Sequence, residues 1–123
     1  MHTKNPDERA RELHELIEDE RKKRHTTTAV GNTTEEISII GTNEEYMRLE
    51  IRRALFEHEI IAKSRAGNDA EENVMEEATQ RNLTLIEIGA SRPICLDCEE
   101  KIKANGIETQ TAFSGKVSKN RRV

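Results

Sequence analysis

The only two cysteines of the chain, Cys95 and Cys98, stand three residues apart. Such a pair cannot join distant elements by a disulfide, so the fold must be held together by a hydrophobic core. Aromatic residues make up 2% of the 123 residues, and tryptophan is absent. We therefore expect an aliphatic core in a single domain, without a surface of many aromatic rings on which nucleobases could stack.

We expect this domain to cover residues 1–123, with an N-terminal helix (1–25), a core (26–115) and a basic tail (116–123). Asn5 and Pro6 are a typical helix N-cap and first helical residue, and they open a helix predicted over about 6–24. Two stretches rich in β-branched residues, 26–31 and 36–41, flank a polar turn. They predict an antiparallel hairpin.

The rest of the chain continues the alternation of helices and strands. Apolar residues at helical spacing predict a long helix over 44–63, and another helix begins near Asp69. A buried strand is predicted over 83–88, then a helix from Pro93 to Gly106, then a strand over 107–113. This order predicts an α/β three-layer sandwich: a mixed sheet of about five strands with flanking helices, and a functional site at the strand ends.

The charge pattern limits the partners that the chain can have. A net charge of -4 with 36% charged residues indicates a well-solvated surface rather than a basic nucleic-acid wrapper. No apolar run reaches about 18 residues, so no membrane segment is expected, and the N-terminus lacks the apolar stretch of a signal peptide. Basic residues gather at the C-terminus, where they form either a solvated tail or phosphate contacts: Lys116, Lys119, Arg121 and Arg122.

The cysteine pair occupies positions i and i+3 at the start of a predicted helix. Both sulfurs then face one side, and the helix N-terminus favours thiolates. A soft divalent metal needs such donors, but two cysteines exclude a four-cysteine structural site and require other ligands. The same spacing is compatible with a thioredoxin-like redox dithiol or with two buried, inert thiols.

Asp69 and Glu71 are the candidate partners of the cysteines. Their simplest explanation is structural: with Asn68 as the N-cap, both acids fall in the first helical turn, where capping geometry and the helix dipole favour them. The order of the motifs favours a functional role. A helix-opening acid, one residue and a glutamate are followed by a strand and then by a proline and the cysteine pair.

This arrangement resembles the zinc-dependent cytidine deaminase superfamily, and within it the nucleic-acid deaminase domains at the C-termini of bacterial polymorphic toxins. The superfamily signature is His-x-Glu on one helix and Pro-Cys-x-x-Cys on the next, joined by a strand. Residues 69–78 resemble the first motif of the toxin group, and residues 89–98 resemble the second, including one residue inserted after the proline. The resemblance covers residues 26–120.

The resemblance implies that Zn²⁺ is held by Cys95, Cys98 and Asp69, with Asp69 in the place of the usual histidine. It implies that Glu71 is the proton shuttle. Substrate contacts are implied at four positions: Asn43, Ala70, Ser91 and Arg92. A carboxylate binds zinc as an imidazole does, but it adds negative charge beside two thiolates, so the bound water becomes less acidic. The sequence is compatible with a working variant, a slow enzyme or a site that has lost catalysis.

Other titratable residues near these motifs receive structural interpretations. His58 is an alternative nitrogen donor, although its place in an apolar stripe favours a packed core histidine. The remaining histidines lie in charged segments and are expected to be solvated: His2, His14 and His25. Three further glutamates are expected on a solvated helix face: Glu72, Glu76 and Glu77.

The reaction that the resemblance implies is hydrolytic deamination of a nucleobase, with cytosine favoured over adenine. Glu71 would accept a proton from a zinc-activated water as its oxygen attacks the base, and would then protonate the leaving ammonia. The implied substrate is DNA or RNA, single-stranded by preference. The domain would be the toxic end of a larger secreted bacterial effector, delivered into the cytoplasm of a target cell and blocked by an immunity protein.

Three alternatives stay open at this point. The first is a deaminase of free nucleosides or nucleotides. The second is a non-catalytic, zinc-stabilised binding module, in which Asp69 marks lost activity. The third is a metal-free dithiol protein.

Overall fold

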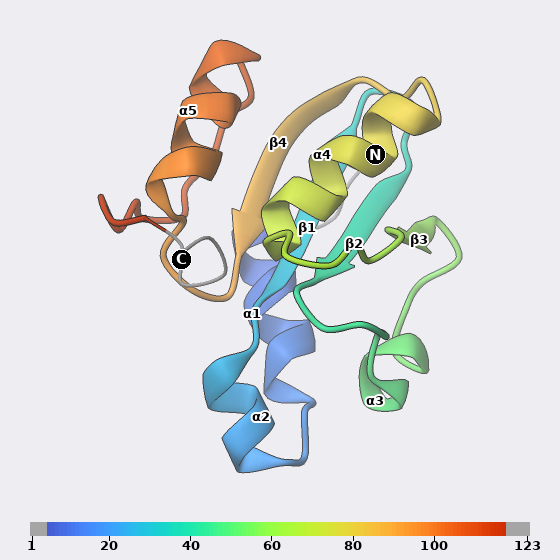
Figure 1. Cartoon of the computed structure of the whole chain (residues 1–123). Helices are drawn as coiled ribbons and strands as arrows, with labels where there is room; N and C mark the ends of the chain where they lie inside the picture. Colours follow the sequence, from blue (N-terminus) through green and yellow to red (C-terminus); the bar gives the residue numbers. More distant parts are fainter. Residues whose placement is uncertain (1–4, 118–123) are drawn as a thin grey trace.

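The computed structural model describes residues 5–117 of the chain (Figure 1). Within that range the elements are, in order, α1 (Pro6–Glu15), α2 (Glu20–His25), β1 (Thr28–Thr33), β2 (Ser38–Thr42), α3 (Leu49–Arg52), β3 (Glu59–Ile61), α4 (Ala70–Gln80), β4 (Leu85–Ala90) and α5 (Leu96–Ala104). No helix in this part of the chain combines the length and the apolar composition needed to cross a membrane.

The strands form one mixed sheet in the order β3-β2-β1-β4. β1 is antiparallel to both β2 and β4, and β3 runs parallel to β2 at the edge. Successive residues of β1 face opposite sides of the sheet. Ala29 joins the core cluster beneath α4 and α5, and Val30 joins the cluster beneath α1. The sheet is thus the middle of three layers, and the predicted α/β class with a mixed sheet is confirmed (Figure 1).

Local signals predicted the beginning of the chain well. The Asn5 Oδ1 atom accepts a hydrogen bond from the backbone N–H of Glu8 at 2.9 Å, with Pro6 as the first helical residue. The predicted hairpin forms as β1 and β2. The single helix predicted over 6–24 is wrong, however. It is divided into α1 and α2, because Asp19 caps a second helix by accepting the backbone N–H of Lys22 at 3.1 Å.

The helix predicted over 44–63 is also wrong. This segment holds the four-residue α3 and then β3, which pairs with the open edge of β2. A buried ion pair favours the strand: Arg9 of α1 donates to both carboxylate oxygens of Glu59, at 2.7 and 2.8 Å. The same guanidinium lies 4.2 Å from the centroid of the Phe56 ring. These contacts between distant parts of the chain override the helical spacing of apolar residues, and Leu49, which was expected on a second apolar flank of that helix, is exposed.

The strand predicted over 107–113 does not form a ladder, so the described sheet has four strands rather than about five. The segment makes isolated bridges with Glu87 and Ile94. Between them, the Thr111 hydroxyl accepts the backbone N–H of Ala90 at 3.0 Å. A side chain therefore takes the place that a backbone carbonyl would hold in a regular ladder, and the ladder is interrupted.

Gly41 of β2 sets how closely α4 approaches the sheet. A Cβ atom at this position would lie 2.7 Å from the backbone oxygen of Ala70 and 2.8 Å from a side-chain carbon of Val74. We expect Gly41→Ala to displace the start of α4, and Asp69 with it, and to lower the free energy of unfolding by about 1–3 kcal/mol. Denaturant unfolding measures this loss. An unchanged unfolding midpoint would contradict the close approach.

Candidate metal centre

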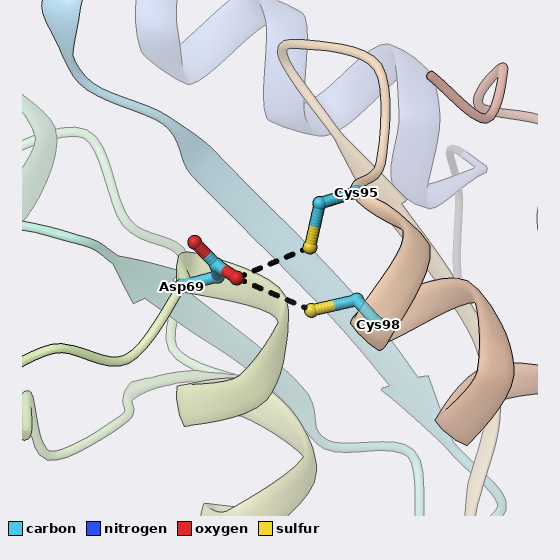
Figure 2. Close-up of side chains that lie close together, drawn as sticks. All are labelled: Asp69, Cys95 and Cys98. Atoms are coloured by element: carbon cyan, nitrogen blue, oxygen red, sulfur yellow. Dashed lines mark hydrogen bonds between the residues drawn. The ribbon is translucent and has the colours of Figure 1, made fainter. Parts of the chain in front are cut away.

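Asp69 stands at the N-terminus of α4 but does not cap the helix. It is the N-cap residue, in place of the predicted Asn68, and its side chain makes no capping hydrogen bond. An N-cap aspartate ordinarily accepts a backbone N–H from two or three residues further on. Figure 2 shows the carboxylate of Asp69 turned toward two cysteine sulfurs instead. A purely structural role as a helix cap therefore does not account for this residue.

Both cysteines lie at the beginning of α5. Cys95 is the N-cap residue, also without a side-chain capping bond, and Cys98 is the third residue of the helix. Pro93 therefore precedes the helix rather than opening it, which corrects the prediction. As expected, the spacing places both sulfurs at one end of the helix. Cys98 is fully buried, whereas Cys95 is partly exposed.

The three side chains converge with a geometry that suits a divalent metal. The Oδ2 atom of Asp69 lies 3.2 Å from the sulfur of Cys95 and 3.7 Å from that of Cys98. The three donor atoms all lie within 4.8 Å of one another. Ligand atoms about 2.0–2.3 Å from a tetrahedral zinc ion stand about 3.3–3.8 Å apart. The donors therefore fit such an ion with small movements and leave a fourth coordination position for another ligand.

The surroundings of the two cysteines raise the pKa of both thiols. Burial raises the pKa of the Cys95 thiol, and it raises the pKa of the Cys98 thiol more strongly. The carboxylate of Asp69 adds to both effects, so without a cation the thiols stay protonated. A divalent cation reverses this because it deprotonates the thiols that coordinate it. Redox dithiols need a lowered thiol pKa, so these surroundings disfavour the thioredoxin-like alternative.

Glu71 is buried beside the three candidate ligands, with 3% of its surface exposed. Burial raises the pKa of its carboxyl group to about 7; the Asp69 carboxylate raises it as well, and the Arg92 guanidinium opposes the rise. The Glu71 carboxylate in turn raises the pKa of the Cys98 thiol, so it lies close enough to interact with the ligand group. A carboxyl group with a pKa near neutrality can both accept and donate a proton at that pH.

Two of the four predicted substrate contacts use their side chains to hold the fold. The Oδ1 atom of Asn43 accepts the backbone N–H of Thr27 at 2.9 Å. The hydroxyl of Ser91 accepts the backbone N–H of Thr28 at 3.0 Å. Both bonds fix the start of β1, at the end of the sheet where α4 and α5 begin (Figure 1). Their contacts with a substrate stay predictions.

The other two predicted substrate contacts flank the metal ligands. Ala70 is the first residue of α4 and is buried. Arg92 is partly exposed and acts on the pKa of Glu71, which places its guanidinium within electrostatic range of the site. Lys116 is exposed, and its backbone oxygen accepts the N–H of Leu96 at 2.9 Å. The other predicted phosphate contacts lie outside the described residues: Lys119, Arg121 and Arg122.

The predictions for the histidines are partly wrong. His58 is partly exposed rather than packed in the core, and its ring stacks on that of Phe56 with the centroids 5.9 Å apart. His14, expected in solvent, is buried. His25 is exposed, as predicted, and His2 lies outside the described residues.

The sequence analysis did not identify the residues that hold α4 against the sheet and against α5. Asn73 is completely buried and donates from Nδ2 to the backbone oxygen of Thr42 at 2.9 Å. An asparagine inside a helix has a low helix propensity, which could have marked it as a special contact. Glu72, expected in solvent, is buried and accepts a hydrogen bond from Lys101 of α5 at 2.6 Å. This ion pair links the two helices that carry the metal ligands.

Glu76 and Glu77 are the other two glutamates that were predicted on a solvated helix face. Glu77 is buried instead: it accepts the backbone N–H of Lys63 at 2.9 Å and pairs with Arg81 at 2.6 Å. Glu76 is partly exposed, in better agreement with the prediction, and it pairs with Arg65 at 3.2 Å.

The chain thus places a largely buried group of one carboxylate and two thiols, able to hold a metal ion, beside a buried glutamate with a raised pKa. Comparison with protein-family models, with curated proteins and with solved structures finds no match to this chain.

Proposed function

We propose that the protein is a zinc-dependent hydrolase that deaminates a nucleobase, with cytosine the favoured base and nucleic acid the favoured substrate. The observation that carries this proposal is the convergence of Asp69, Cys95 and Cys98 next to the buried Glu71. Three protein ligands with a fourth position open are typical of catalytic rather than structural zinc. The resemblance of residues 69–78 and 89–98 to deaminase motifs supports the choice of reaction.

Proton transfer is the task of Glu71 in this mechanism. Zinc, when bound, supplies Lewis-acid activation of a water molecule. Glu71 accepts a proton from this water as the oxygen attacks the amidine carbon of the base, which is C4 in cytosine. Glu71 then donates a proton to the amino group, which leaves as ammonia. One water is consumed, and a C–O bond replaces a C–N bond.

The carboxylate of Asp69 makes the centre more negative than a histidine would. Two thiolates and one carboxylate around a dication carry a net charge of about -1, which makes an activated water less acidic. The N-terminal ends of α4 and α5 both lie at the centre, because Asp69 and Cys95 are their N-cap residues. The partial positive charge of two helix ends offsets part of this negative charge.

A substrate panel tests the proposal. The full chain, loaded with one equivalent of zinc, is incubated separately with single-stranded DNA, duplex DNA, RNA and free nucleosides, and the products are separated by chromatography and identified by mass spectrometry. We expect conversion of cytosine to uracil in single strands, with release of ammonia. Deamination of free nucleosides alone would favour the alternative of a nucleoside deaminase. A folded, zinc-loaded protein that deaminates none of these substrates would contradict the proposal.

One observation favours a second candidate, a zinc-stabilised binding module without activity. This observation is Asp69 itself, since an acidic ligand opposes the activation of water. In such a module zinc would stabilise the fold, and replacing Glu71 would change no measured function. The proposed setting, a toxin domain of a larger secreted effector that acts in a target cell and is inhibited by an immunity protein, rests on the resemblance alone.

A further inference from the structure

Helix α2 concentrates positive charge on an acidic chain. Four of its six side chains are Lys or Arg and one is glutamate, whereas the whole chain has a net charge of -4. None of its residues is buried. Lys23 lies 3.6 Å from the carboxylate oxygens of two glutamates. Arg21, Lys22 and Arg24 are exposed and form no ion pair within 4 Å of an acidic side chain between residues 5 and 117, although Lys22 lies within electrostatic range of Asp19.

This helix is held at the end of the sheet where the candidate metal centre lies. The buried His14 joins α2 to β1: its Nε2 atom lies 2.6 Å from the backbone oxygen of Lys23, and its Nδ1 atom lies 2.9 Å from the hydroxyl of Thr28. The backbone N–H of Thr28 donates to Ser91, four residues before Cys95. In Figure 1, α2 lies beyond the end of the sheet at which α4 and α5 begin.

An exposed aromatic ring lies on the segment 43–50, whose two ends are hydrogen-bonded to the residues on either side of α2. After the helix, Thr27 donates its backbone N–H to Asn43, and before it, Glu18 donates its backbone N–H to Glu50 at 3.1 Å. The segment 43–50 is therefore tied at both of its ends to the residues that flank α2. Between these ties stands Tyr46, the only tyrosine of the chain, with 74% of its surface exposed.

We propose that α2 and Tyr46 form a binding surface for single-stranded nucleic acid. Arg21, Lys22 and Arg24 contact consecutive phosphates, and the ring of Tyr46 stacks on one unpaired base. Proteins that bind single strands combine a cationic path with aromatic side chains in this way. In a duplex the bases are already stacked, so the surface favours unpaired strands. This inference rests on the proposed function in taking nucleic acid as the substrate, and it adds where the strand binds outside the metal centre.

The test uses the full chain with Glu71→Gln, so that the probe is bound and not consumed. Fluorescence anisotropy measures binding of a labelled single strand of about 12 nucleotides at several salt concentrations. Replacing Arg21, Lys22 and Arg24 together with glutamine should weaken binding at least about tenfold at low salt. The slope of log affinity against log salt should fall by about 2, which is about 0.7 for each phosphate contact.

A matched control removes the same number of charges elsewhere. Lys63, Arg81 and Lys103 are exposed cations outside α2, and replacing all three with glutamine should change the affinity by less than about threefold. Tyr46→Ala should weaken binding about tenfold, whereas Tyr46→Phe, which keeps the ring, should bind as the wild type does. A duplex of the same length should bind more weakly and should be insensitive to Tyr46→Ala.

Each outcome of these binding experiments tests one part of the proposal. Equal losses in the α2 variant and in the control variant would overturn the surface, and an unchanged affinity of Tyr46→Ala would overturn the base contact. Duplex binding as tight as single-strand binding would show attraction to any polyanion and would overturn the preference for single strands. A wild-type protein that binds strands through α2 but deaminates nothing would refute the proposed function while leaving this surface in place.

Discussion

Glu71→Gln should lower the rate of deamination by about 10²–10⁴-fold while the protein keeps its zinc. Glutamine has nearly the shape of glutamate, so it fits the same buried position, but it can neither accept the proton of the attacking water nor pass one to the leaving amine. Zinc content measured by atomic spectroscopy and rates measured by ammonia release separate the two properties. The metal ligands are untouched, so the metal content should match that of the wild type.

Glu76→Gln is the matched control for this variant. Glu76 lies on the same helix, and the substitution makes the same change of charge, but Glu76 is partly exposed and pairs with Arg65 at 3.2 Å. We expect the wild-type rate from this control. Wild-type activity in Glu71→Gln would exclude Glu71 as the proton shuttle. Loss of zinc together with activity would instead assign Glu71 to the stability of the metal centre.

Cys98→Ala should abolish stoichiometric zinc binding, because it removes one of the three candidate ligands that the structure brings together within residues 5–117. In the wild type, zinc at about 1,000 times its dissociation constant should stabilise the fold by about 4 kcal/mol. The Cys98→Ala variant should lose this zinc-dependent gain in stability. Thermal unfolding with and without added zinc measures it for both proteins.

A core substitution on the same helix separates loss of metal from loss of packing. Ile102 is 1% exposed and lies one turn after Cys98. Ile102→Val should cost about 0.5–1.5 kcal/mol of stability yet keep both the zinc and the gain that zinc gives. If Cys98→Ala bound one zinc with wild-type affinity, the sulfur of Cys98 could not be a ligand.

Several parts of the fold were predictable from local signals, although the cap at Asp19 that starts α2 was missed. Asn5 before Pro6 marked the start of α1, and the β-branched stretches marked the hairpin. Gly106, with a φ of 66°, takes the left-handed conformation expected just after the end of α5. In each case the deciding contacts lie within a few residues in sequence, so a pattern of residue types contains enough information.

The fold was not predictable where contacts between residues far apart in the sequence determine the local structure. Residues 59–61 became a strand because Arg9, fifty residues earlier, binds Glu59 and because β2 offered an open edge. The segment 107–113 makes isolated bridges rather than a ladder because the Thr111 side chain pairs with the backbone of Ala90. Neither contact corresponds to a periodic pattern of residue types in the sequence.

The candidate site was also predictable only in part. The resemblance of the two motifs to the deaminase signature implied that Asp69 would meet the cysteines, and the structure brings these three side chains together. The burial of Glu72 was missed because its partner, Lys101, lies on another helix. The burial of His14 was missed for a similar reason, since its partners become neighbours only after β1 and α2 have packed.

X-ray absorption at the zinc edge, on the full chain loaded with one equivalent of zinc, tests the metal centre most directly. Two sulfur ligands at about 2.3 Å and oxygen ligands at about 2.0–2.2 Å are expected, and Asp69→Ala should lower the zinc affinity without removing either sulfur. A first shell without sulfur, or the absence of one tightly bound zinc per chain, would contradict joint coordination by Asp69, Cys95 and Cys98.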